Sequence, residues 1–309
     1  FQSYAPRVTA PLLWLSATND FHQFMDDTYR TADLLPGKVR FSFAPHLNHR
    51  FTDAFAVTRP LWLDEHLKGS FRFPESPNSK LTLAGEGGIP RLEIKPDLSK
   101  AIDHVDLFYS IDPDPQARFW RTAKATSLRG NIWSAPLPVL STELPLFAFA
   151  NVHYKLAKPQ AIQFSKPAET FAISSQLHTA SSDELKTNQV KATDKPSRLI
   201  DDFSNGFRDW YLLSENNPHH WQYWTRKIND PKWRGPKNSQ LAFEIKTAKP
   251  NAMVVMITEN FFRSYRGKKR EWLAEIVLPG GADWHPVTLR PSKFKSLDGK
   301  KSLGSWDHA

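Results

Sequence analysis

Residues 11–20 read PLLWLSATND and residues 38–50 read KVRFSFAPHLNHR, and these two stretches decide the fold of the N-terminal part. Residues 11–17 are a continuous apolar run, which is typical of a strand buried on both faces of a parallel sheet. Residues 38–44 combine aromatic and β-branched side chains, which favours a second strand. We therefore expect two neighbouring parallel strands here.

Helical segments are predicted after each strand. Residues 24–35 have helical character and Gly37 is a stop signal. Thr52 is a candidate N-cap for a helix that runs to Lys68 and ends at Gly69, with Pro60 as a kink or as the real start. The alternation of strand and helix predicts an α/β layer arrangement over residues 1–69.

Two side chains with catalytic potential follow the two strands. Asp20 comes just after the first strand and His49 lies in the loop after the second. The carboxyl ends of parallel strands share one edge of a sheet, where ligands and catalytic groups gather. A carboxylate can orient an imidazole there and stabilise its cation, and the imidazole can act as a general base toward a serine hydroxyl.

The stretches APLLWLSATNDFH and KVRFSFAPHLNHRF resemble the last two strands of an α/β-hydrolase, of the dienelactone-hydrolase, acetyl-xylan-esterase and prolyl-oligopeptidase-like types. The family order is nucleophile, acid, histidine, so the resemblance implies that Asp20 is the catalytic acid and His49 the catalytic histidine. A G-x-S-x-G nucleophile motif occurs nowhere in the 309 residues. We expect the nucleophile and the oxyanion hole to lie upstream of this chain, which alone should lack covalent catalysis.

Two other interpretations of these loops stay open. His46 is the rival to His49, which is preferred because Asn48-His49-Arg50 leads directly into the last predicted helix. Asp20, His22, His46 and His49 could also ligate a metal, but Pro45 and the loop context argue against it. We expect no metal and no cofactor.

From residue 70 the sequence changes to short alternating runs separated by turn signals. The runs KLTLAG, PRLEIKP, HVDLFYSI, RFWRTAKA, IWSAPLP and LFAFANVHYKL have the rhythm of a β-sandwich. Residues 70–157 resemble the immunoglobulin-like tail of hydrolases of the PhoPQ-activated pathogenicity-related type. Residues 158–198 are predicted to be a linker or long loop, since many of them are polar.

Residues 199–309 are predicted to form a jelly-roll β-sandwich, with strands at 240–246, 252–258, 271–278 and 284–290. The opening DDF and the closing VTLRPSKFKSLDGKKSLGSW resemble jelly-roll carbohydrate-binding modules. Aromatic rings mixed with polar groups suit sugar stacking, although the same rings can fill a sandwich core. The candidate ligand-binding residues are Trp221, Tyr223, Trp224 and Trp233.

Composition limits which partners, covalent cross-links and membrane segments the chain can have. The formal net charge is +9, but the charges are dispersed, so a nucleic acid is not expected as a partner. Cysteine is absent, which excludes disulfides and cysteine metal sites, and no run approaches the length of a membrane span. We expect the C-terminal part of a periplasmic or secreted serine hydrolase that acts on carbohydrate-linked esters. The alternatives are a non-catalytic binding protein for a polysaccharide or other glycan, and a peptidase of the same fold.

Overall fold

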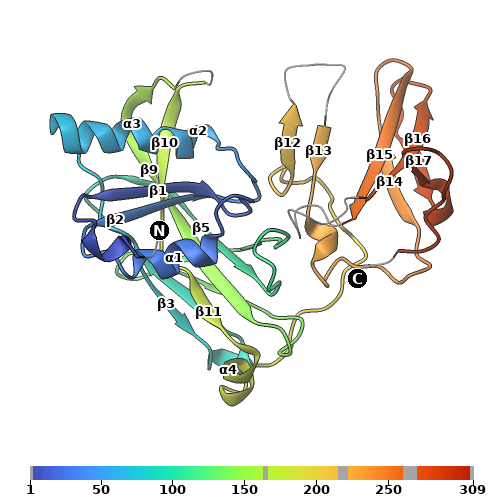
Figure 1. Ribbon diagram of the computed structural model, residues 1–309. Coiled ribbons are helices and arrows are strands. Elements are labelled where there is room, and N and C mark those ends of the chain that lie inside the picture. Colours follow the sequence, from blue (N-terminus) through green and yellow to red (C-terminus); the bar gives the residue numbers. More distant parts are fainter. Residues whose placement is uncertain (1–2, 163–165, 215–221, 260–269, 307–309) are drawn as a thin grey trace. The chain divides into compact units, whose positions relative to one another are not determined.

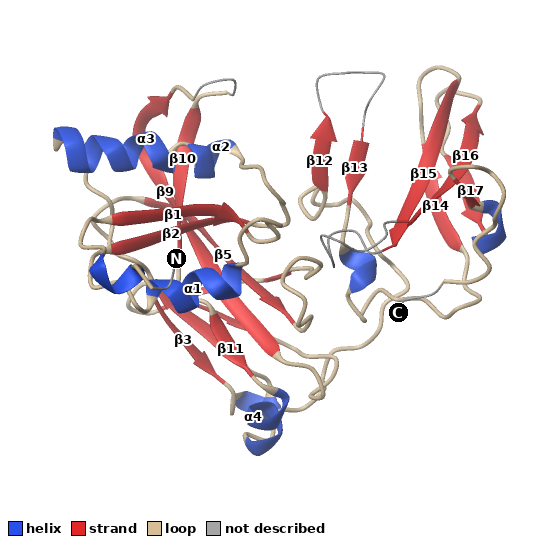
Figure 2. Cartoon of the chain, in the orientation of Figure 1, coloured by secondary structure: helices blue, strands red, loops and turns tan. Residues whose placement is uncertain are grey.

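The computed structural model describes residues 3–162, 166–214, 222–259 and 270–306. The chain is mostly β, with one mixed parallel and antiparallel sheet, several small antiparallel sheets and few helices (Figure 2). It divides into two compact units. Unit 1 comprises Phe1–Pro196 and Asp201–Lys232, and unit 2 comprises Ser197–Ile200 and Trp233–Ala309.

A mixed sheet of seven strands organises unit 1 (Figure 1). Its strand order is β1-β2-β10-β9-β5-β6, and β11 pairs with β9. Only β1 and β2 are parallel, and every other pairing in the sheet is antiparallel. The strands are β1 (Leu12–Ala17), β2 (Val39–Ala44), β5 (Ile102–Ser110), β6 (Arg121–Ala123), β9 (Leu146–Gln160), β10 (Ala168–Ser174) and β11 (His178–Ala180).

The predicted pair of parallel strands is confirmed, and helices cover both of its faces. Successive side chains of β2 point to opposite faces of the sheet. Phe41 and Phe43 pack with α1 (Met25–Ala32), while Ala44 packs with Phe55 of α2 (Asp53–Ala56). The third helix, α3 (Thr58–Leu63), lies on the same side as α2 (Figure 1). Beyond β2 the sheet continues with β10 and β9, and both Phe41 and Phe43 are buried.

A second, antiparallel sheet packs on the large one. Its order is β3-β4-β8-β7, and its inward side chains join those of β5, β9 and β10 in one hydrophobic core. Most runs predicted between residues 80 and 156 are therefore strands. The strands are β3 (Asn78–Thr82), β4 (Arg91–Lys95), β7 (Thr126–Leu128) and β8 (Ile132–Pro136).

The prediction of a linker over residues 158–198 is wrong for much of that range. It contains β10, in the middle of the large sheet, followed by β11 and α4 (Ser182–Thr187). Phe171 and Ile173 are completely buried, and a capping box formed by Ser181 and Glu184 begins α4. The polar flanks of the strand concealed its short apolar run, AETFAIS, in the sequence.

The range 199–309 does not form one compact body. Its first part, with β12 (Tyr211–Ser214) and β13 (Gln222–Trp224), belongs to unit 1. The four strands predicted for the remainder are present in unit 2 as two small antiparallel sheets, β14-β17 and β15-β16-β18. They are β14 (Leu241–Ile245), β15 (Asn251–Glu259), β16 (Arg270–Leu278), β17 (His285–Leu289) and β18 (Lys295–Ser296).

Helical structure is sparse in the chain. Within the described ranges, no helix is both long and apolar enough to cross a membrane. A π-helical turn, Asp64–Lys68, follows α3 and ends at Gly69, where φ is 64°. Helical turns of the 3₁₀ type cover Ala5–Arg7, Glu86–Gly88, Lys227–Asn229 and Pro291–Lys293.

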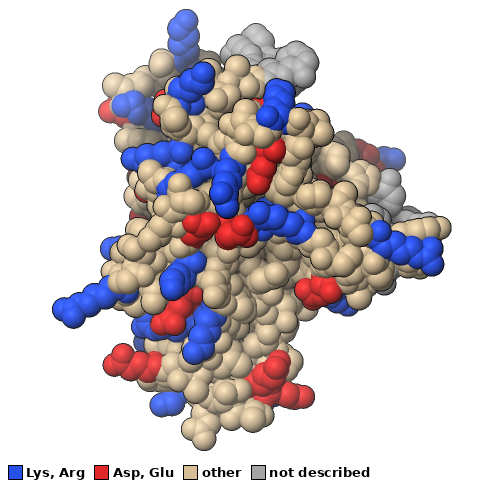
Figure 3. All heavy atoms as spheres, turned by 90° about the vertical axis from the view of Figure 1, so that its left-hand side faces the viewer, with Lys and Arg blue, Asp and Glu red and all other residues tan. Residues whose placement is uncertain are grey.

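The face drawn in Figure 3 shows how the charges are distributed. Lys and Arg side chains lie beside Asp and Glu side chains over this face instead of forming one continuous basic area. Ion pairs of the chain include Lys38–Glu75, 3.1 Å, and Lys68–Asp64, 2.7 Å.

Candidate functional site

Backbone hydrogen bonds hold together the two loops that carry the predicted catalytic pair. The parallel register places Ala17 beside Ala44, so both strands end at the same level. Beyond that point the amide of Thr18 donates to the carbonyl of Ala44, 2.9 Å, and the amide of Asn19 donates to the carbonyl of Leu47, 3.1 Å. The loop after β1 and the loop after β2 are therefore adjacent, as expected for the carboxyl edge of a parallel pair.

Asp20 and His49 form the hydrogen bond that the sequence predicts. His49 Nδ1 lies 2.9 Å from Asp20 Oδ2. The other carboxylate oxygen, Oδ1, accepts the backbone amide of His22, 2.8 Å, and the hydroxyl of Ser16 lies 3.4 Å from Oδ2. These contacts fix the direction of the carboxylate, so that the bond to the imidazole has one defined geometry.

The two members of this pair differ strongly in exposure. The Asp20 side chain is 5% exposed, while the His49 side chain is 61% exposed. A buried carboxylate that accepts from Nδ1 leaves Nε2 of the same ring to face a reacting group. The arrangement can orient an imidazole and stabilise its cation, which is the work of the acid in a triad.

The side chain of Asn48, next to His49 in the chain, connects this loop to a segment that is distant in sequence. Asn48 Oδ1 accepts the backbone amide of His49, 2.6 Å, and the hydroxyl of Tyr211, 2.5 Å. Tyr211 begins β12 and is almost completely buried, and the guanidinium of Arg50 lies 5.7 Å from the centre of its ring. The segment Asp201–Lys232 thus supports the histidine loop from within unit 1.

His46, the rival histidine, has a different environment. Its ring is buried, stacks on Phe119 at 5.1 Å, and has Nε2 3.8 Å from Asp209 Oδ1. Its carbonyl accepts from Arg226, 2.8 Å. Burial lowers the pKa of His46 to about 4, although the negative charge of Asp209 acts to raise this pKa. A buried ring that packs on Phe119 suits a structural role, and His49 holds the bond to Asp20.

The alternative metal set of Asp20, His22, His46 and His49 does not converge. The His22 and His49 rings are edge to face, with 5.0 Å between their centres, and His46 lies toward Asp209 instead. Among the described residues, three potential metal ligands come together at another place, formed by His104, Asp106 and His153. The sequence signal for that cluster was the spacing His104-x-Asp106, which puts both side chains on one face of a strand.

The predicted sugar-binding aromatics have separate positions. Trp221 lies outside the described residues. Tyr223 and Trp224 are half-buried in β13 of unit 1, and Trp233 is half-buried in unit 2.

Tyr223 instead belongs to an aromatic cluster that the sequence reasoning missed. Its ring stacks on Phe207 with 4.0 Å between centres, and Phe203 stacks on Trp210 at 5.6 Å. Phe203 and Phe207 remain 46% and 40% exposed. The signal was the spacing of Phe203, Phe207 and Trp210 in DDFSNGFRDW, where successive rings are four and three positions apart. We call Phe203, Phe207, Trp210 and Tyr223 the aromatic cluster.

Comparison with protein-family models, with curated proteins and with solved structures finds no match for this chain.

Proposed function

We propose that this chain supplies the acid and the histidine of a serine hydrolase, with Asp20 as the acid and His49 as the general base. The observation that carries the proposal is the 2.9 Å contact between His49 Nδ1 and the buried Asp20 carboxylate, at the carboxyl ends of two adjacent parallel strands. The nucleophile and the oxyanion hole come from a segment outside these 309 residues. Sequence resemblance to α/β-hydrolases supports the same assignment.

The outer edge of β1 is a second argument for this proposal, because further strands could extend the sheet there. In the described residues β1 pairs only with β2, so its other edge has no strand beside it. Leu12, Leu13, Trp14 and Leu15 are all only half-buried, although their sequence is that of a strand buried on both faces. An apolar edge strand is a template for further strand pairing. The strands that carry the nucleophile would pair here.

The proposed reaction is hydrolysis of a carbohydrate-linked ester by a secreted or periplasmic enzyme. The esterase assignment rests on the resemblance of residues 10–22 and 38–51 to acetyl-xylan-esterase-type sequences. In this proposal the antiparallel strands of residues 70–157 correspond to an immunoglobulin-like module, and unit 2 corresponds to part of a jelly-roll module. The stacking aromatics of unit 1 provide a surface for the sugar.

The test compares the isolated chain with the complete gene product. The isolated chain should neither hydrolyse p-nitrophenyl acetate above background nor react with a fluorophosphonate probe. The complete protein should do both, and His49→Ala should lower its kcat by about 10⁶-fold. His66→Ala is the matched control, because His66 is an exposed histidine in the turn after α3. Full activity of the His49→Ala protein, or labelling of the isolated chain, would overturn the proposal.

The aromatic cluster favours a second function, binding of a glycan without catalysis. Sugar C–H faces stack on exposed rings, and carboxylates accept hydrogen bonds from hydroxyl groups. Asp201 lies within this neighbourhood, where it accepts from the indole of Trp210, 2.9 Å, and pairs with Lys227, 2.8 Å. Exposed aromatic surface of this kind is a common mark of a binding site.

Calorimetric titration with xylan- and pectin-derived oligosaccharides tests this function. Phe207→Ala should weaken binding about ten- to hundredfold, by analogy with other base- or ring-stacking platforms. Tyr4→Ala is the control, since Tyr4 is an exposed aromatic residue in the N-terminal part. Equal affinity of the two variants would place the glycan elsewhere, and no binding by the unmodified chain would exclude this function for these oligosaccharides.

A further inference from the structure

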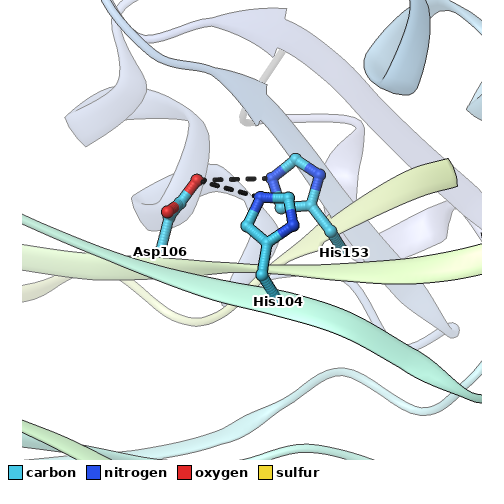
Figure 4. Close-up of side chains that lie close together, drawn as sticks. All are labelled: His104, Asp106 and His153. Atoms are coloured by element: carbon cyan, nitrogen blue, oxygen red, sulfur yellow. Dashed lines mark ion pairs between the residues drawn. The ribbon is translucent and has the colours of Figure 1, made fainter. Parts of the chain in front are cut away.

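Two histidines and an aspartate converge on adjacent strands, apart from the Asp20–His49 pair (Figure 4). His104 and Asp106 lie two residues apart on β5, so their side chains share one face of the sheet. The antiparallel register places His153 of β9 directly opposite His104. The three side chains come from the two longest-paired strands of the sheet, which makes their relative position well defined.

The distances between the three groups fit a metal site better than a set of hydrogen bonds. His104 Nε2 and His153 Nε2 lie 3.4 Å and 3.6 Å from the same oxygen, Oδ2 of Asp106. Hydrogen bonds of this type are shorter, near 2.8 Å. Ligands about 2.0–2.1 Å from a tetrahedral Zn²⁺ are separated by about 3.3–3.4 Å. The distances from Asp106 Oδ2 to the two imidazole nitrogens are therefore close to those that a tetrahedral site requires.

Outer contacts orient two of the three groups. His104 Nδ1 lies 2.8 Å from Asp103 Oδ2, which leaves Nε2 of the ring directed at Asp106. A carboxylate on the far nitrogen is the usual partner of a metal-ligating histidine. Arg208 forms an ion pair with the other oxygen of Asp106, Oδ1, so Oδ2 remains directed at the two histidines.

We propose that His104, Asp106 and His153 bind one divalent transition-metal ion, with Zn²⁺ as the preferred ion. Two imidazoles and one carboxylate are ligands that Zn²⁺ accepts, and they leave a fourth position for water. The His104 side chain is 46% exposed, so the ion can enter from solvent. The hard ions Mg²⁺ and Ca²⁺ prefer oxygen ligands and are not expected to bind here.

Metal binding would rearrange the two rings. They stack with 4.0 Å between their centres and 12° between their planes. A metal ion lies in the plane of each imidazole that ligates it, so one ring must tilt to bring both nitrogen atoms onto one ion. His104 is the exposed member of the pair, so it is the ring that can tilt.

The test is a Zn²⁺ titration of the complete, tag-free chain against a fluorescent chelator at pH 7.5. One equivalent should bind, and Co²⁺ should give the visible absorption of a four-coordinate site. His104→Ala should abolish both signals. Asp103→Asn should weaken binding about 10–100-fold, because it removes the outer partner of a ligand. His66→Ala should leave the titration unchanged.

Arg208→Gln provides an outcome in the opposite direction. The positive charge of Arg208, at Asp106 Oδ1, repels a cation bound at Oδ2. Arg208→Gln keeps a hydrogen-bond donor for Oδ1 but removes this charge, so it should tighten Zn²⁺ binding while the fold is retained. A misfolded variant cannot produce that gain. Absence of stoichiometric binding, or equal affinity in the unmodified chain, His104→Ala and Arg208→Gln, would overturn the proposal. None of these results depends on the hydrolase assignment.

Discussion

Arg121 and Asp230 form a buried, two-point ion pair between β6 and the segment Asp201–Lys232. Arg121 Nε donates to Asp230 Oδ2 at 2.7 Å, and Nη2 of the same guanidinium pairs with Oδ1. The two side chains are 3% and 1% exposed. Asp194 accepts from Arg121 Nη1, 2.9 Å, and from Lys232, 2.7 Å, which extends the pair to a network of two cations and two carboxylates. This network attaches residues 201–232 to the rest of unit 1.

Removing Asp230 should therefore destabilise unit 1. Asp230→Ala leaves the Arg121 guanidinium buried without its two-point partner, and loss of one member of such a pair costs about 3–5 kcal/mol. Urea unfolding of the chain, followed by circular dichroism, measures the effect. Asp33→Ala is the control, because Asp33 is an exposed residue after α1 and its loss should change stability by about 0.5 kcal/mol or less. Equal stabilities for the two variants would contradict the role given to the network.

Acid should destabilise unit 1 through His46. Its pKa is lowered by burial to about 4 in the folded protein, against an ordinary value of 6.5. The charges of Arg226, Lys227 and Arg208 also lower it, while Asp209 raises it. Between pH 6.5 and 4 the unfolded chain binds the proton more readily, so the free energy of unfolding falls as the pH falls through this window. Above pH 6.5 this contribution is fully present.

The matched variant for this effect is His46→Asn. The residue has a φ of 63°, a conformation that asparagine tolerates better than most residues, so the backbone need not change. The variant should show a smaller loss of stability between pH 6.5 and 4, by on the order of 2–3 kcal/mol. Urea unfolding at pH 7.0 and 4.5 measures the difference, with EDTA present to exclude bound metal. Parallel pH profiles for the two proteins would show that His46 does not carry the effect.

Local patterns in the sequence predicted the strands and the Asp20–His49 contact, but not the pairing of β2 with β10. The ends of two parallel strands meet wherever the strands pair, so Asp20 and His49 could be predicted from residues 11–50. The β2–β10 contact joins residues that are 130 and 131 positions apart. The hydroxyl of Ser42 donates to the carbonyl of Ala172, 2.8 Å, and the amide of Phe43 donates to Ser174 Oγ, 2.8 Å. Such non-local pairing depends on the packing of the whole unit, which local propensity does not encode. The cluster of His104, Asp106 and His153 was missed for the same reason, since it requires the register of β5 with β9.

Amide exchange should differ between the two parallel strands. An edge strand leaves one row of its backbone groups without a neighbouring strand, so its amides exchange faster than those of a strand paired on both sides. With β10 beside β2, the fast exchange should be confined to β1, which lies at the edge of the sheet in the described residues. Hydrogen exchange followed by mass spectrometry should show peptides of β1 exchanging faster than those of β2, and β9 exchanging most slowly. Protection of β1 equal to that of β9 would contradict this order.

The tautomer of His49 gives a test of the candidate site that needs no enzymatic activity. If Asp20 orients the ring as in a triad, the neutral imidazole carries its proton on Nδ1 and donates it to Asp20 Oδ2 across the 2.9 Å contact. Long-range ¹H–¹⁵N correlation spectra of the chain should then show the Nδ1–H tautomer for His49 and the more common Nε2–H form for the exposed His66.

Asp20→Asn can present its amide N–H₂ to Nδ1, which should shift the proton of His49 to Nε2 and leave His66 unchanged. Because the backbone amide of His22 also holds the carboxylate, at 2.8 Å, Asp20→Ala should additionally broaden the signals of residues 20–22. A His49 ring in the Nε2–H form in the unmodified chain would mean that Asp20 does not select the tautomer, and the catalytic assignment of the pair would fail with it.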